Sequence, residues 1–371
     1  MSVGYSAEHE QLRQSVRRFL AEKSPLSEVR RLMEAGASRD DSLWAQLSGQ
    51  LGLPGIAIPE EYGGSGYGPV ELGIVVEEMG RALLVAPFFS TVVLAAHALL
   101  TSGDEEAKRR WLPAIASGEL TATLAVAEEA GSWDPESVTA TAIPDGGGWL
   151  ITGSKLFVVD GDTADLLLVV ARTPDGLGVF GVEGDAAGLE RARLEALDLT
   201  RPLAAVTLRD VAAVQVGAGR AAGAWLAQTL DLVRVALAAE QVGGAGRCLD
   251  LAVEYAKVRE QFGRPIGSFQ AIKHKCAGLL VEVESGRSAV QAASAALAGG
   301  APDAPVTAAV AHAYCSRAFT QAAKECIQIH GGIGYTWEHD AHLYLRRAKS
   351  DELLLGSPAR ERARLAQLTG V

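Results

Sequence analysis

The sequence predicts an α+β protein, because the spacing of its apolar residues changes twice along the chain. Between residues 6 and 118 apolar residues recur with the 3.6-residue period of amphipathic helices. Near residue 120 the period becomes 2, which is typical of β-strands, and from residue 221 the helical period returns. We therefore expect an N-terminal α-helical domain (1–119), a middle antiparallel β domain (120–217) and a C-terminal α-helical domain (218–371).

Within these domains, capping residues and turn residues predict the elements. Ser6 precedes a run in which Leu12, Val16 and Phe19 share one face, so we expect Ser6 to cap the first helix. Pro and Gly make 53–66 a loop. Further helices are expected at 70–84, 88–100, 105–117, 222–262, 268–298, 303–330, 336–351 and 358–369, and strands at 121–126, 149–152, 166–171 and 178–182.

The composition excludes several classes of function. With 371 residues, 48% of them hydrophobic, the chain can bury a large core. A net charge of -11 without a block of basic residues disfavours nucleic acid or an anionic membrane as partner. The cysteines lie singly and are read as small apolar residues, so we expect no metal site. Neither a signal peptide nor an apolar run of membrane-spanning length is present, which predicts a cytoplasmic protein. The four cysteines are Cys248, Cys276, Cys315 and Cys326.

A corner near residue 260 combines residues that suit a nucleotide. A long helical run ends at Arg259, Gln261 and Phe262, the chain breaks at Gly263, and Ser268 is expected to cap the next helix. A guanidinium can pair with a phosphate in bidentate fashion, while an aromatic ring takes a planar heterocycle. The alternative is a helix hairpin with a surface arginine, and the corner alone does not separate the two.

A second segment strengthens the nucleotide interpretation. Residues 328–335 read Gln-Ile-His-Gly-Gly-Ile-Gly-Tyr after another helical run, and Gly331–Gly332 is a helix stop where bare backbone can approach a ligand. Together, RxQFGxxxxxxQ and QxxGGxGY resemble the C-terminal domain of the acyl-CoA dehydrogenases. The PEEYGG segment within 53–66 is similar to the same family, and the resemblance covers essentially the whole chain.

The resemblance implies the acyl-CoA dehydrogenase fold, with a C-terminal four-helix bundle, and FAD as cofactor. Members oxidise an acyl-CoA to its 2-enoyl-CoA: a carboxylate removes the α-proton and the flavin accepts the β-hydride. Each FAD is shared, because one subunit holds the flavin ring and supplies the base, while its neighbour clamps the ADP half. The electron acceptor implied is an electron-transferring flavoprotein. The residues matched to the ADP half are Arg259, Gln261, Phe262, Gln270, Gln328, Gly331 and Gly332.

The half that a subunit uses for itself departs from the family pattern. Ala127 replaces the Thr of the family's T-E-P-G-x-G-S-D loop. In the segment 157–160, Phe-Val-Val-Asp replaces W-I-[TS]-N, so a second hydroxyl is lost at Val159. A flavin bound here would lack two orienting hydrogen bonds, each contributing roughly 1 kcal/mol.

The catalytic base is missing from both positions at which the family carries it. Leu355 occupies the usual glutamate position, and Val233, before Arg234, occupies the other. Glu240 is a weak alternative base, but a buried structural carboxylate is the more probable interpretation; Glu352 reads as a solvated helix residue. His274, His330 and His342 are read as structural histidines, and Trp133 and Trp337 as packing residues.

One hypothesis fits this asymmetry. The chain resembles the subunit without the catalytic glutamate in actinobacterial α2β2 acyl-CoA dehydrogenases, which hold one FAD per unlike pair and some of which act on steroid side-chain CoA thioesters. A self-sufficient homotetramer using Glu240 or another carboxylate is one alternative. A non-catalytic scaffold that binds a CoA ester or a flavin is another.

Overall fold

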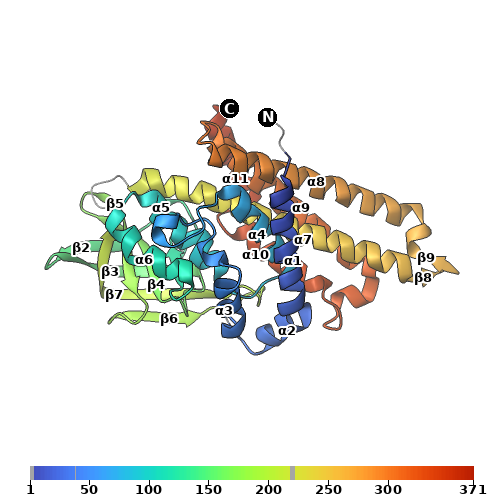
Figure 1. The fold of residues 1–371 in the computed structure, drawn as a ribbon, viewed down its shortest axis with the longest axis horizontal. Coiled ribbons are helices and arrows are strands. Elements are labelled where there is room, and N and C mark those ends of the chain that lie inside the picture. Colours follow the sequence, from blue (N-terminus) through green and yellow to red (C-terminus); the bar gives the residue numbers. More distant parts are fainter. Residues whose placement is uncertain (1–3, 38, 218–221) are drawn as a thin grey trace. The chain divides into compact units, whose positions relative to one another are not determined.

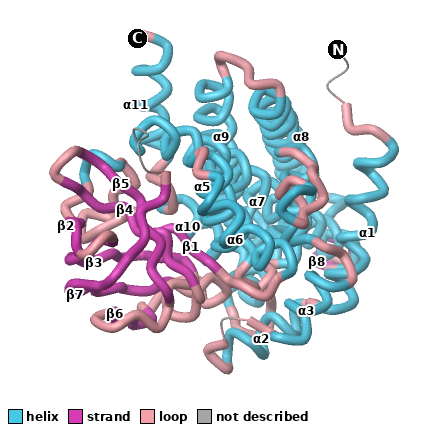
Figure 2. The backbone as a smooth tube through the Cα atoms, turned by 60° about the vertical axis from the view of Figure 1, so that its left-hand side comes forward, coloured by secondary structure: helices cyan, strands magenta, loops and turns pink. Residues whose placement is uncertain are grey.

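The structure is a computed structural model that describes residues 4–37, 39–217 and 222–371. The chain divides into two compact units, each assembled from segments distant in the sequence. One contains Met1–Arg30, Pro69–Leu84 and Arg234–Val371, and the other contains Arg31–Gly68 and Val85–Val233. The helical, β, helical order expected along the chain is present (Figures 1 and 2).

The first unit is helical except for one short hairpin, in the part that the structure describes. Helix α9 contacts α8, α10 and α11, so it lies at the centre of the C-terminal bundle. The helices are α1 (Ala7–Lys23), α4 (Pro69–Ala82), most of α7 (Ala222–Val258), α8 (Gln270–Ala298), α9 (Ala304–His330), α10 (Ala341–Leu353) and α11 (Pro358–Thr369). The hairpin consists of β8 (Glu260–Gln261) and β9 (Arg264–Pro265).

Two adjacent glycines allow α7 to pack tightly. A Cβ at Gly243 would lie 1.8 Å from the Glu77 carbonyl oxygen of α4, and one at Gly244 would lie 2.4 Å from the Phe319 ring of α9. Real atoms cannot approach so closely. Glycine therefore lets α7 lie against α4 and α9 at the same time.

The start of α1 agrees with the sequence. Ser6 Oγ accepts the His9 backbone N–H at 3.2 Å, and His9 Nδ1 accepts the Ser6 N–H at 3.2 Å, which completes a capping box. Further along, Arg13 pairs with Glu77 at 2.9 Å and with Glu78 at 3.2 Å. The predicted cap is confirmed, and buried ion pairs hold α1 to α4.

The second unit holds the β-sheet. Its strand order is β1-β4-β2-β3-β7-β5; β5 also pairs with β4, so the sheet closes on itself, and β6 pairs with β7. The strands are β1 (Ala122–Ala125), β2 (Thr141–Asp145), β3 (Gly148–Val159), β4 (Leu166–Thr173), β5 (Gly176–Glu183), β6 (Leu189–Arg193) and β7 (Leu203–Val216). Most pairs are antiparallel, as expected, but β4 pairs in parallel with β1 and β2, so the sheet is mixed.

Several helices of the second unit precede this sheet in the sequence. They are α3 (Asp41–Gly49), the π-helix η3 (Phe89–Ala96), α5 (His97–Ser102) and α6 (Glu105–Ser117), while α2 (Leu26–Glu34) runs from one unit into the other. Trp111 of α6 packs on Gly181 of β5, where a Cβ would lie 2.7 Å from its ring. The interior of β4 is fully buried, which explains its unbroken apolar run.

The structure corrects several sequence expectations. Strands β2, β6 and β7 were missed, because their exposed residues break the apolar pattern. A 3.6 period over two turns cannot distinguish α from π, so 88–100 was expected to be wholly α-helical. Helix α7 ends at Val258 and α10 begins only at Ala341. Ser268 is not a cap: it lies in the 3₁₀ turn Ile266–Ser268, and Phe269 precedes α8 without a side-chain capping bond.

Candidate functional site

The corner after α7 is a tight hairpin with a strained, exposed tip. The Arg259 N–H donates to the Tyr255 carbonyl at 2.9 Å, and the Ile266 N–H donates to the Arg259 carbonyl at 2.8 Å. At the tip Phe262 and Gly263 have φ of 57° and 73°, and two positive φ values are what a type I′ turn requires. Asn usually occupies the first of these positions, because a bulky side chain is disfavoured at positive φ.

Nothing within the described residues explains why this tip carries an aromatic ring. The Phe262 side chain is 91% exposed, and its ring lies edge-on to the Phe269 ring at 6.1 Å. The Arg259 guanidinium is exposed and makes no hydrogen bond or ion pair with the residues that the structure describes. Strained, exposed residues of this kind cluster at ligand sites. Figure 1 shows the hairpin at the far end of α7 and α8.

The glycine turn after α9 offers bare backbone. Helix α9 ends at His330, and Gly331 has a φ of 65°. A Cβ at Gly331 or at Gly332 would meet no atom within 4 Å, so both face open space. Gln328, two residues before His330, is also exposed. A phosphate or a planar ring could reach the main chain here without steric hindrance.

A ring contact brings the corner and the glycine turn to the same end of the bundle. Tyr255, one turn before Arg259, stacks on His330 with ring centroids 4.4 Å apart. Gln270 lies at the start of α8, directly after the corner. The residue types present, a guanidinium, an aromatic ring, side-chain amides and bare backbone, fit the ADP half of FAD.

Two positions in the segments matched to the flavin ring are buried and apolar. Ala127 is 2% exposed and Val159 is 1% exposed, and neither carries a hydroxyl. Glu128 binds Lys155 Nζ at 2.7 Å. Burial opposes ionisation of Glu128, but hydrogen bonds from Lys155, Thr139 and the Ala140 N–H outweigh it and lower its pKa to about 2. The carboxylate next to Ala127 therefore serves the fold.

Sequence analysis missed a buried titratable group beside Val159. Asp160 accepts a hydrogen bond from Ser90 Oγ of η3 at 2.6 Å. Burial raises the pKa of Asp160 to about 7, although Ser90 and the nearby Arg201 guanidinium act in the opposite direction. The only sequence signal is an aspartate where the resembling family has asparagine.

Neither position matched to the catalytic base carries a carboxylate. Leu355 is 3% exposed and has a φ of 64°, which is unusual for leucine. Val233 is fully buried. The neighbouring Arg234 is paired with Glu361 of α11 at 3.1 Å.

The substitute carboxylates have structural partners. Glu240 is 4% exposed and forms a buried ion pair with Arg347 of α10. Glu352 is half-buried rather than solvated, since it accepts a hydrogen bond from Thr320 Oγ1 at 3.2 Å and pairs with Lys349. Trp133 is buried as expected, but Trp337 is 54% exposed. Cys276 is half-buried, whereas the other three cysteines are buried.

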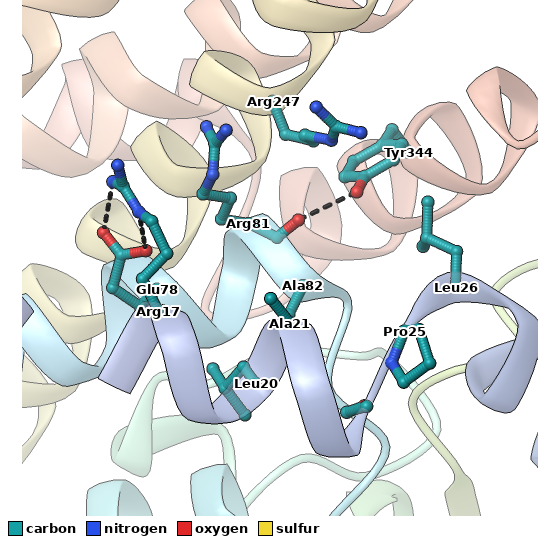
Figure 3. A pocket seen from close by; sticks show the side chains of 11 residues that line it. Arg17, Leu20, Ala21, Pro25, Leu26, Glu78, Arg81, Ala82, Arg247 and Tyr344 are labelled. Carbon is teal, nitrogen blue, oxygen red and sulfur yellow. Dashed lines mark hydrogen bonds and ion pairs between the residues drawn. The ribbon is translucent and has the colours of Figure 1, made fainter. Parts of the chain in front are cut away.

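The first unit also contains an open pocket of about 400 Å³, which is not this site (Figure 3). Three arginines line it, and each has a carboxylate partner: Arg17 binds both oxygens of Glu78, at 2.8 and 2.7 Å, Arg81 pairs with Asp250 at 2.6 Å, and Arg247 pairs with Glu254 at 3.4 Å. None of the seven residues matched to the ADP half lines it. Among the described residues, no helix is long and apolar enough to cross a membrane.

Comparisons with known proteins agree with the fold and the motifs. Three family models match the chain: the acyl-CoA dehydrogenase N-terminal domain over residues 6–119, the middle domain over 123–211 and the C-terminal domain over 223–368. The acyl-CoA dehydrogenase IpdE2 of Mycobacterium tuberculosis is 37% identical over 351 residues, which cover 95% of this chain and 94% of the relative. Members of the family bind FAD.

Two similar solved structures contain pairs of different gene products. A variant of the Tcur3481–Tcur3483 steroid acyl-CoA dehydrogenase has a TM-score of 0.90 and 35% identity, covering 98% of each chain. The ChsE4–ChsE5 complex from Mycobacterium tuberculosis has a TM-score of 0.90 and 28% identity, covering 100% of this chain and 99% of the other.

Proposed function

Because the chain belongs to the acyl-CoA dehydrogenase family, we propose that it is the subunit without the catalytic base in a heteromeric enzyme. The observation that carries this proposal is the contrast between Leu355, apolar and buried, and Arg259, exposed at the corner and without a side-chain partner among the described residues. The chain offers a nucleotide site to a neighbour while its own proton acceptor is missing.

Each residue of the corner and the glycine turn then has a role. Bound FAD would supply the hydride acceptor for α,β-dehydrogenation of an acyl-CoA whose α-proton the partner's carboxylate removes. Arg259 would hold the pyrophosphate, and Phe262 with Gln261 and Gln270 would cover the ADP half. Gln328, Gly331 and Gly332 would bind it through side-chain amide and main chain.

The substrate and the partners are proposed from the similar structures. The likeness to a steroid acyl-CoA dehydrogenase supports a steroid side-chain CoA thioester as substrate. The likeness to two complexes of unlike gene products supports a second acyl-CoA dehydrogenase subunit as partner, in an α2β2 assembly. An electron-transferring flavoprotein is the proposed acceptor. The domain boundaries 1–119, 120–217 and 218–371 and a cytoplasmic location belong to the same proposal.

Co-expression tests this function. The chain alone is expected to purify without FAD, whereas co-expression with a base-bearing acyl-CoA dehydrogenase subunit is expected to yield a complex with one FAD per two chains. The measurement is flavin absorbance against protein mass. Purification of the chain alone with one FAD per chain and full turnover would overturn the proposal in favour of a homotetramer.

Two other functions have less support. For a homotetramer, the carboxylate named as base is Glu240, which is buried in an ion pair with Arg347. A scaffold without catalysis would give no acyl-CoA oxidation with any partner, so the activity of the co-expressed complex separates it from the proposed function.

A further inference from the structure

A stack of three aromatic rings joins the two segments assigned to the ADP half of FAD. Tyr255 of α7 stacks on His330 of α9, with ring planes 30° apart. His330 in turn faces His339, just before α10, at a centroid distance of 4.2 Å and an angle of 44°. Residues from three separate places in the chain therefore meet in one series of ring contacts, stacked at the first and tilted at the second, hereafter the ring stack, of Tyr255, His330 and His339.

Tyr255 and His330 are each linked directly to one of the two binding segments. The Tyr255 carbonyl accepts the Arg259 N–H, so any shift of Tyr255 moves the backbone of the corner. His330 immediately precedes Gly331, and its Nδ1–H donates to the Cys326 carbonyl at 2.7 Å, which fixes the orientation of the ring. The contact between these two rings therefore lies between the corner and the glycine turn.

His339, the outer ring of the ring stack, is restrained by neighbouring residues. His339 Nδ1 accepts the Ala341 N–H at 3.1 Å. Arg30 donates from Nε to Asp340 at 2.6 Å and from a terminal nitrogen to the His339 carbonyl at 2.8 Å. Since Arg30 is half-buried, this charge-assisted pair of bonds restrains the His339 backbone and keeps the outer ring against His330.

We propose that Tyr255, His330 and His339 are positioning residues for the ADP half of FAD. They set the distance between the Arg259 guanidinium and the bare backbone of Gly331 and Gly332. This inference rests on the proposed function, because both segments must hold the same ADP group. Guanidinium–phosphate bonds are directional, so a displacement well under 1 Å between the two segments is expected to weaken binding.

The test measures FAD release from whichever purified assembly carries FAD, by the rise of flavin fluorescence after dilution. His339→Ala removes the outer ring and is expected to release FAD about fivefold faster. His339→Phe keeps a ring in place and should stay within about twofold of wild type. His342→Ala is the matched control, since it loses a ring contact with Trp337 at 4.6 Å that is not part of the ring stack.

A purely structural role would change thermal stability rather than FAD release. The FAD-free chains of His339→Ala and His342→Ala are therefore expected to unfold at similar temperatures while only His339→Ala releases FAD faster. If His339→Ala does not fold, Arg30→Gln provides the second test, because it loosens the His339 backbone with all rings present; about twofold faster release is expected.

The outcomes separate this inference from the proposed function. Wild-type release in both His339→Ala and Arg30→Gln, with faster release in Arg259→Ala, would overturn the positioning role and leave the FAD site standing. Wild-type release in Arg259→Ala as well would overturn both.

Discussion

The residues matched to the ADP half of FAD and the three positions of the flavin half that lack the expected polar side chain differ in exposure as well as in chemistry. Phe262 is 91% exposed on a strained turn next to Arg259, which has no side-chain partner among the described residues. Ala127, Val159 and Leu355 are apolar and at most 3% exposed. Exposed strain contributes nothing to the stability of a lone chain, so it indicates an external ligand, whereas buried apolar side chains add to the core.

The comparison also separates side chains from backbone. Phe157 and Leu355 have φ of 57° and 64°, which costs a non-glycine residue roughly 1–2 kcal/mol. Both lie in segments where the side chains expected for catalysis are missing. These segments therefore carry strained backbone as the corner does, and the two regions differ in their side chains.

Glu240→Gln gives the largest expected effect, and it tests the carboxylate named as the alternative base of this chain. The change removes the negative charge of a buried ion pair while Arg347 keeps its positive charge, so the free energy of unfolding should fall by about 3–5 kcal/mol. Chemical denaturation measures this loss, with Glu352→Gln as a partly exposed control that should cost less. Unchanged stability with turnover reduced 10²-fold or more would instead identify Glu240 as the base.

Asp160→Asn has the second largest expected effect, and it tests the buried carboxyl group beside Val159. The pKa of Asp160 is about 7 in the fold against an ordinary 3.8, so the folded state binds the proton more tightly. Its contribution to stability is complete below pH 3.8 and is lost as pH rises through 7, a total on the order of 4 kcal/mol. Asparagine does not titrate, so the stability of the variant relative to wild type should increase between pH 5 and pH 8.

Thermal unfolding at those two pH values measures this difference. Asp175→Asn, in an exposed turn, is the control and should follow wild type at both. Parallel behaviour of Asp160→Asn and wild type would mean that Asp160 is already ionised at pH 5.

Arg259→Ala tests the other region. A charge-assisted phosphate contact contributes roughly 1.5–3 kcal/mol, so the FAD affinity of the complex should fall about tenfold or more. Titration of the FAD-free complex measures this. Arg264→Ala is the neighbouring control: its guanidinium lies 4.2 Å from the centre of the Phe269 ring, and a smaller loss is expected. Equal affinity in Arg259→Ala and wild type would remove Arg259 from the site.

Local sequence patterns predicted the fold well, but contacts between residues distant in the sequence could not be predicted. Ser6 and the apolar run of β4 carry their signal within a few residues. Glu240 visibly interrupts an apolar helix face, but nothing in the sequence identifies Arg347 as its partner across more than a hundred residues. For the same reason, the contact of His330 with Tyr255 and His339 could not be read from spacing.

Leu355→Glu should have the smallest effect on turnover, and it tests whether position alone makes a base. The new carboxylate would replace a side chain that is 3% exposed, so burial would raise its pKa and favour the protonated form, which cannot accept a proton. Ala127 and Val159 would still offer no hydroxyl to a flavin. We expect acyl-CoA-dependent reduction of an electron acceptor by the assembled complex to stay within about twofold of wild type, and FAD to remain at one per two chains.

Leu353→Glu, at a position that is 69% exposed, controls for the added charge. A rise to one FAD per chain with increased turnover would show that the flavin half had stayed competent and that only its base was missing, which would reduce the contrast between the two regions to a single residue.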